Sequence, residues 1–282
     1  MNPRRMANGA LVALRGLGLS ALWAVGTLTW ATGEPLPLAT RDPAAPRSVT
    51  ASGESGGARL SPGGKFLLWT STADDLVTHV HNGPVADLFV RDQTTGEVSL
   101  VSVTPDGRNG GDGNTYQGVI SEDGRWVAFE SEAGNLVAGE TAPPGVRFYL
   151  RDRIAQSTRR IPFPAVEPLL QGRGVPLEAP LAMDPAGDRV AFVSGGLVYL
   201  HHRESGSTFN LTRPLVPFTP GTAGLQSFAP QFDDSGRWLA FGSTVPNLAR
   251  LTSGQVRGLQ VYVFRLDRGH LGEIPNRQRA PL

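Results

Sequence analysis

The sequence of 282 residues contains no cysteine. This absence excludes disulfide bonds, thiolate metal ligands, a cysteine nucleophile and the lipid-modified cysteine that tethers bacterial lipoproteins. An excess of charge is also lacking, because 26 lysine and arginine residues face 25 aspartate and glutamate residues. The formal net charge of +1 gives no bulk electrostatic reason to expect nucleic acid or a membrane surface as a partner. We therefore expect no nucleic-acid ligand.

Long hydrophobic runs are scarce as well. The apolar stretch from Gly16 to Ala31 is shorter than the roughly 20 residues that span a bilayer. It follows Arg4 and Arg5, contains no charge and ends in small residues, which is the layout of a secretory signal peptide. We expect a signal peptide at residues 1–31 and a proline-rich leader at 32–46, with an uncleaved anchor as the alternative. Export then ends in the periplasm or outside the cell, with no membrane span after cleavage.

Glycine and proline, in contrast, are plentiful at 35 and 23 residues, which favours many short elements joined by turns. One pattern occurs four times, and in each copy a glycine is followed seven residues later by a serine. Each copy combines a hairpin-type turn with a short apolar run that contains aromatic residues, as expected of a strand. The copies are SPGGKFLLWTS at 61–71, SEDGRWVAFES at 121–131, DPAGDRVAFVS at 184–194 and DDSGRWLAFGS at 233–243.

Further strands complete each unit. A second apolar segment follows every copy, a third strand is expected at 98–103 in the first unit, and another strand precedes each glycine turn. Four strands per unit is the composition of a propeller blade, so the sequence predicts an all-β propeller of four recognisable four-stranded blades. The second segments are DLFVRD at 87–92, RFYLRD at 147–152, LVYLHH at 197–202 and QVYVFR at 260–265.

The segment SEDGRWVAFESEAGNLVAGE followed by RFYLRD resembles the repeats of TolB-like and WD-repeat-like bacterial β-propellers. The resemblance covers residues 47–275 and implies a propeller domain there, followed by a C-terminal tail at 276–282. It implies a fold and not a role, because propellers host many unrelated functions. The third copy departs from the pattern, since Ser194 is followed almost at once by the next strand. Many members of the group have six or more blades, which leaves the ring size open.

Closure of the ring is a separate question. Residues 47–50 repeat the pattern of residues 101–104, so an outermost-type strand precedes the first full unit. We expect this strand to complete the last blade, as termini often do in propellers. A leftover half-repeat is the alternative, and residues 270–275 compete for the same place.

The long loops indicate where a partner binds. If the strands of a blade run A to D from the axis outward, the A–B and C–D turns lie at one end and the B–C and D–A loops at the other. The long connections 71–86, 131–146, 243–258 and 104–114 then gather at one end. The alternative is that the Asp and Asn residues of these loops make local turns, while the leucine that follows each of them plugs the blade edge. The candidate binding residues of this long-loop end are Asp75, His79, His81, Asp106, Asp112, Asn135 and Asn247.

Three motifs suggest chemistry, and their surroundings argue against it. Residues 53–57 match G-x-S-x-G, but no hydrophobic strand precedes them and no helix is expected after them. His79 and His81 have a spacing usable for zinc, without a nearby third ligand. The loop from Asp106 to Asn114 is rich in oxygen ligands, yet its spacing does not match a calcium-binding loop. We therefore predict no catalytic residue, no metal site and no cofactor, with calcium as an alternative that the spacing does not support.

The resulting hypothesis is an exported, non-enzymatic interaction module. It binds a protein or an envelope polymer through the long-loop end or the mouth of the axial channel. One alternative is a propeller enzyme, a polysaccharide lyase or hydrolase or a peptidase, whose acid and base come from different blades at the channel mouth. Another is a half-ring that completes itself by pairing with a second chain.

Overall fold

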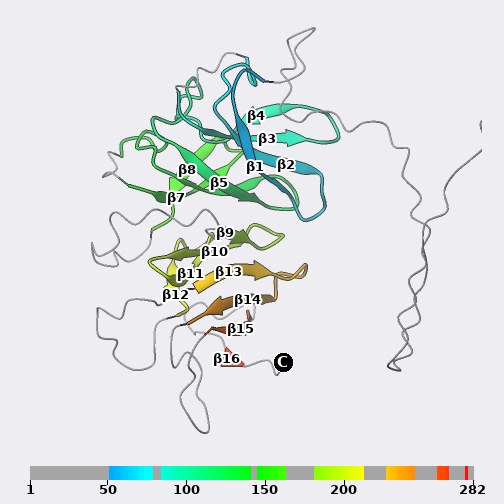
Figure 1. Cartoon of the computed structure of the whole chain (residues 1–282), viewed down its shortest axis with the longest axis vertical. Helices are drawn as coiled ribbons and strands as arrows, with labels where there is room; N and C mark the ends of the chain where they lie inside the picture. Colours follow the sequence, from blue (N-terminus) through cyan, green and yellow to red (C-terminus); the bar gives the residue numbers. More distant parts are fainter. Residues whose placement is uncertain are drawn as a thin grey trace, which may run out of the picture. The chain divides into compact units, whose positions relative to one another are not determined.

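The computed structural model describes residues 51–78, 84–140, 145–162, 181–212, 227–244, 259–266 and 277–278. These residues form four antiparallel sheets of four strands each, which are four blades of a β-propeller (Figure 1). The described residues contain no helix, and so none with the length and apolar character needed to cross a membrane. The expected signal peptide and leader lie outside the described residues.

Each blade uses its strands in the order of the chain. Blade 1 consists of β1 (Ser55–Leu60), β2 (Phe66–Ser71), β3 (Asp87–Asp92) and β4 (Val98–Leu100), and blade 2 of β5 (Thr115–Ile120), β6 (Trp126–Ser131), β7 (Arg147–Asp152) and β8 (Ser157–Arg160). Blade 3 consists of β9 (Leu181–Met183), β10 (Arg189–Ser194), β11 (Leu197–His202) and β12 (Thr208–Asn210), and blade 4 of β13 (Ser227–Phe232), β14 (Trp238–Ser243), β15 (Gln260–Arg265) and β16 (Arg277–Gln278).

The glycine turns have the predicted hairpin geometry. The four repeat glycines have φ angles between 64° and 75°, a region that other residues rarely adopt. A side-chain oxygen at the first turn position accepts a hydrogen bond from the amide that opens the next strand. Ser121 does so for Trp126 at 2.9 Å and Asp233 for Trp238 at 2.7 Å. This cap explains why Ser or Asp begins every copy of the repeat.

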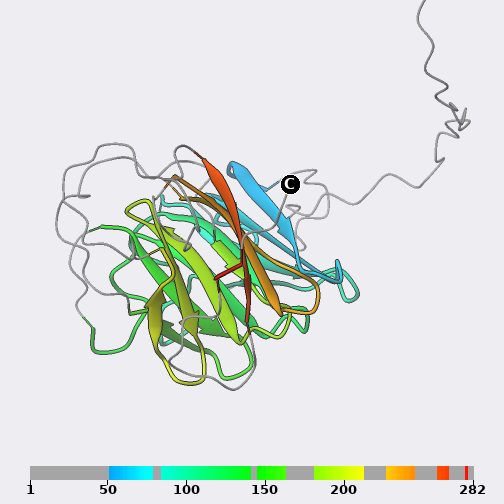
Figure 2. The ribbon, with the colours of Figure 1, turned by 90° about the horizontal axis from the view of Figure 1, so that it is seen from below.

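Successive blades pack face to face. The inner strand β5 packs against blade 1, β9 packs against β5 and β6 of blade 2, and β13 packs against blade 3. Blades 2 and 3 accordingly lie side by side in both views (Figures 1 and 2). Apolar clusters fill the three junctions, with Val127 and Phe129 at the first and Leu239 and Phe241 at the third. Val127, Phe129, Leu239 and Phe241 thus face the preceding blade, whereas the corresponding Leu67 and Trp69 of the first repeat pack within blade 1.

The packing among the described strands runs from blade 1 to 2, from 2 to 3 and from 3 to 4. Residues 47–50 and 270–275, the two segments expected to compete for the last blade, lie outside the described residues. The fourth strand of blade 4 is instead β16, which pairs Arg277 with Phe264 and Gln278 with Val263. The last sheet therefore extends beyond residue 275, where the sequence predicted the propeller to end and a tail to begin. Closure through residues 47–50 stays a prediction.

Candidate functional site

Asp75 belongs to a hydrogen-bonded clip that joins two segments of blade 1. Its carboxylate oxygens accept hydrogen bonds from the Ser52 amide at 2.9 and 3.0 Å. The Ser52 hydroxyl donates to Asp74 at 2.7 Å and to Asp75 at 3.0 Å. Both aspartates lie between β2 and β3, and Ser52 precedes β1. The Asp75 side chain thus holds the entry to the inner strand against the long loop.

Asp112 and Asn135 form a similar clip in blade 2. Asn135 Oδ1 accepts a hydrogen bond from the Asp112 amide at 3.1 Å, and Asp112 Oδ1 accepts one from the Gly134 amide at 2.6 Å. Leu76 and Leu136, which follow Asp75 and Asn135, are each 1% exposed. In these two loops the Asp or Asn side chain therefore bridges to the segment before the inner strand, 23 positions away, rather than to a local turn, while the following leucine is buried at the blade edge.

Of the other candidate residues of the long-loop end, the structure describes only Asp106. Asp106 accepts hydrogen bonds from the Thr104 hydroxyl at 2.6 Å and the Arg108 amide at 3.1 Å, and both lower the pKa of its carboxyl group. His79, His81 and Asn247 lie outside the described residues, so a binding role for them stays a prediction. Across the described ranges, no three His, Asp or Glu side chains are grouped to hold a metal ion.

Ser55, the serine of the G-x-S-x-G match, opens strand β1. Its hydroxyl donates to the Ser71 hydroxyl at 2.9 Å, and Ser71 donates to the Glu54 carbonyl at 2.9 Å. Thr115 and Ser131 repeat this pair at 3.0 Å in blade 2. The pair joins the inner strand to its neighbour, and it explains the serine that ends the repeated motif.

Asp87 is a buried carboxylate that the sequence analysis did not single out. It opens β3, and its Oδ1 accepts hydrogen bonds from the Ser102 hydroxyl at 2.5 Å and the Gly111 amide at 3.2 Å. Its Oδ2 is buried without a hydrogen-bond partner among the described residues. Burial raises the pKa of Asp87 to about 6, although the two hydrogen bonds act in the opposite direction. The only signal in the sequence is an aspartate where blades 2 and 4 have Arg147 and Gln260.

We expect this raised pKa to make blade 1 less stable as the pH rises. The folded protein holds the Asp87 proton more tightly than the unfolded chain, so the protonated carboxyl group stabilises the fold. This stabilisation is complete below about pH 4 and is lost as the pH rises through about 6. The Asp87→Asn variant cannot ionise at this position, so it does not lose this stabilisation. The difference in free energy of unfolding, variant minus wild type, should therefore increase by about 3 kcal/mol between about pH 4 and pH 7.5 in urea titrations. Asp106→Asn is the control, because its lowered pKa leaves that interval unaffected.

Polar contacts also link the inner strands of three blades. Arg59 of β1 donates from Nη2 to Gln117 Oε1 at 3.3 Å and from Nη1 to the Leu181 carbonyl at 3.5 Å. Gln117 Nε2 donates to Glu130 Oε2 at 3.0 Å. Burial raises the pKa of Glu130, while the hydrogen bond from Gln117 lowers it. Arg59 therefore links the inner strands of blades 1, 2 and 3, and Gln117 connects it to the buried Glu130 carboxylate on β6.

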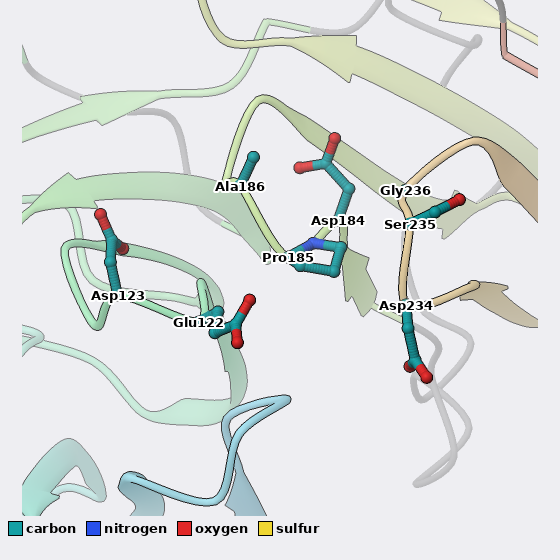
Figure 3. A pocket seen from close by; sticks show the side chains of 8 residues that line it. All are labelled: Glu122, Asp123, Asp184, Pro185, Ala186, Asp234, Ser235 and Gly236. Carbon is teal, nitrogen blue, oxygen red and sulfur yellow. The ribbon is translucent and has the colours of Figure 1, made fainter.

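A recess of about 530 Å³ lies where the A–B turns of blades 2, 3 and 4 meet. Figure 3 shows carboxyl groups coming from all three turns. The turns of blades 2 and 3 are joined directly, because the Glu122 amide donates to the Pro185 carbonyl at 2.8 Å. We call this feature the turn-end recess; it is lined by Glu122, Asp123, Asp184, Pro185, Ala186, Asp234, Ser235 and Gly236.

The carboxylates of the turn-end recess fall into two kinds. Asp184 is buried and forms an ion pair with Arg189 at 2.8 Å, and Arg189 in turn donates across the junction to the Gly236 carbonyl of blade 4 at 2.6 Å. Glu122, Asp123 and Asp234 are exposed to solvent. The recess thus presents negative charge on a protein whose net charge is close to zero. The sequence analysis missed it, although acidic residues lie in the turns that carry the repeat glycine in copies two, three and four.

Comparisons with known proteins find similarity in structure only. No protein-family model and no curated protein matches the sequence. A putative TolB from Agrobacterium tumefaciens is similar at a TM-score of 0.41 and 16% identity, over 76% of this chain and 58% of that one. An oligogalacturonate lyase in complex with manganese is similar at a TM-score of 0.42 and 12% identity, over 77% of this chain and 51% of that one.

The tricorn protease is a third similar structure, at a TM-score of 0.42 and 12% identity over 76% of this chain. This chain spans 58%, 51% and 18% of the putative TolB, the lyase and the tricorn protease. All three are propeller proteins, which is the fold that the four sheets show.

Proposed function

We propose that this protein is an exported, non-enzymatic propeller module that binds a partner protein. We further propose that its turn-end recess receives lysine or arginine side chains of that partner. The observation behind this proposal is the recess itself, to which Glu122 and Asp123 of blade 2 and Asp234 of blade 4 bring exposed carboxylates. Carboxylates attract cations, and a concave surface increases that attraction because it concentrates the field.

The contrast with the long-loop end supports this placement. Asp75, Asp112 and Asn135 hold their own loops through hydrogen bonds. Glu122 and Asp234 instead extend from turns whose geometry is maintained by backbone bonds and by Ser121 and Asp233. Side chains that the fold does not need are the ones available to a partner.

We expect the double variant Glu122→Gln/Asp234→Asn to lose affinity for a fluorescein-labelled oligolysine peptide by about five- to thirtyfold. Ion pairs with solvent-exposed carboxylates contribute up to about 1 kcal/mol each, so the loss of two costs about 1 to 2 kcal/mol. Fluorescence anisotropy at two salt concentrations measures it, and the wild-type affinity should fall as salt rises.

The matched control is Glu97→Gln/Glu204→Gln, which removes the same charge from two exposed C–D turns at the same end of the blades. The affinity of this control for the peptide should stay within about twofold of the wild-type affinity, because its substitutions weaken only the nonspecific attraction between protein and peptide. Equal losses in the two double variants would show that the peptide binds to overall charge and not to the recess. Binding of peptidoglycan fragments in place of the peptide would also overturn the proposal.

A further inference from the structure

The three described junctions between blades share one contact. The first residue of each second strand lies against the turn glycine of the following blade. A β-carbon built on Gly124 would lie 2.2 Å from the Phe66 ring, and one on Gly187 would lie 2.8 Å from Trp126. At the third junction, Arg189 lies 3.5 Å from such an atom on Gly236. The turn glycine therefore leaves the space that the preceding blade fills.

A guanidinium group accompanies every one of these contacts. Arg153 donates to the Gly124 carbonyl at 2.6 Å and lies over the Phe66 ring at 5.5 Å. Arg203 donates to the Gly187 carbonyl at 3.0 Å and lies over Trp126 at 4.4 Å. At the third junction the donor is Arg189 itself, at 2.6 Å from the Gly236 carbonyl.

Blade 4 presents the same kind of face, and no further blade of the described residues lies against it. Trp238, which corresponds to Phe66 and Trp126, is 38% exposed. Val261 on the neighbouring strand is 52% exposed, whereas the corresponding Phe148 of blade 2 is 5% exposed. The opposite face of blade 4 is buried in the core, so the exposure is confined to the side on which a next blade would lie.

Blade 1 presents the complementary face. All six residues of β1 are exposed, and Leu60 is 59% exposed whereas the corresponding Ile120 of blade 2 is 4% exposed. Gly64 has a φ of +70° like the other turn glycines. No atom of the described residues lies within 4 Å of a β-carbon built on it. It is the one turn glycine of the four repeats whose space is unfilled among the described residues.

We infer that a second copy of this chain docks its blade 1 on the exposed face of blade 4. The contact repeats the internal junction, with Trp238 against Gly64 of the other copy. Val261 corresponds to Leu88 and Ala58 corresponds to Gly118. At the first internal junction Leu88 lies 2.6 Å from a β-carbon built on Gly118, so Val261 should lie beside Ala58 of the other copy. Arg265 stacks on Trp238 at 5.9 Å and takes the place of the arginine that blade 1 lacks. Such an interface joins two different surfaces, so the copies add head to tail. They form a closed ring or continue as an open chain.

Disulfide trapping tests the docking, because the chain has no cysteine of its own. The variants Ala58→Cys and Val261→Cys are prepared separately, mixed under mild oxidation and analysed on non-reducing gels. We expect the mixture to form a cross-linked dimer that neither variant forms alone. The double variant Ala58→Cys/Val261→Cys should form cross-linked species of two or more chains. Circular dichroism confirms that each variant is folded.

Two results would overturn the inference. A double variant that cross-links only within one chain shows that blade 4 closes on blade 1 of the same molecule. A mixture that cross-links no more than Ile154→Cys, a more accessible apolar site on blade 2 that is 74% exposed against 52% for Val261, shows random collision. Light scattering gives the independent measure: the wild type should exceed the protomer mass, and Trp238→Glu should not, whereas Ile154→Glu should match the wild type.

Discussion

The Gly124→Ala variant should lose about 2 to 5 kcal/mol of its free energy of unfolding, measured in urea. The φ of Gly124 is +75°, which costs other residues roughly 1 to 2 kcal/mol. The added methyl group would also lie 2.2 Å from the Phe66 ring, and overpacking of a closed junction costs about 1 to 3 kcal/mol. The ring is buried, so it has no free space into which to move.

Gly64→Ala separates these two causes. Gly64 has nearly the same φ, but no described atom lies near the position of the new methyl group, so only the backbone cost of roughly 1 to 2 kcal/mol applies. Combining Gly124→Ala with Phe66→Leu should recover part of the loss, and the double-mutant cycle measures that coupling. Equal losses for the two glycine variants would contradict the steric role of the junction.

Removing the Arg189 guanidinium should be similarly costly. Arg189 donates to Asp184 at 2.8 Å and to the Gly236 carbonyl at 2.6 Å, and both charged groups are buried. Arg189→Met leaves the Asp184 carboxylate buried without its counter-ion and removes a bond between blades 3 and 4. We expect a loss of about 3 to 5 kcal/mol in the free energy of unfolding, as for other broken buried pairs.

Arg125→Met is the matched control for this variant. Arg125 and Asp152 form an ion pair of the same 2.8 Å length, but the Arg125 side chain is 40% exposed. Solvent screens such pairs, which typically contribute 1 kcal/mol or less. If the Arg125 variant were destabilised as much as the Arg189 variant, burial would not be what makes the Asp184 pair important.

Most of the strands were predictable because their signals are local. Residues 87–92, 147–152, 197–202 and 260–265 are strands with the boundaries that the sequence indicated. The turn glycines and the alternation of apolar residues act within a few positions, so the printed sequence contains all that is needed to recognise them. The third predicted strand, 98–103, proved shorter, since β4 ends at Leu100.

The candidate site was less predictable, because side-chain availability depends on contacts that the sequence does not display. Asp75 and Asn135 resemble free loop ligands, yet their oxygens accept hydrogen bonds from residues 23 positions away. Glu122 and Asp234 resemble ordinary turn residues, and only the stacking of blades brings them to one recess. Asp87 shows the same difficulty, since nothing local distinguishes a buried aspartate from an exposed one.

The sequence by itself determined the repeat, the two middle strands of each blade and the positive-φ turns, because these follow from turn chemistry and from side-chain alternation over a few residues. Only the tertiary structure decided which side chains meet, such as Arg59 with the carbonyl of Leu181, 122 positions away. It also decided which faces are filled and which are open, because burial is a property of neighbouring blades. The two open faces and the turn-end recess are therefore features of the assembled blades and not of any one repeat.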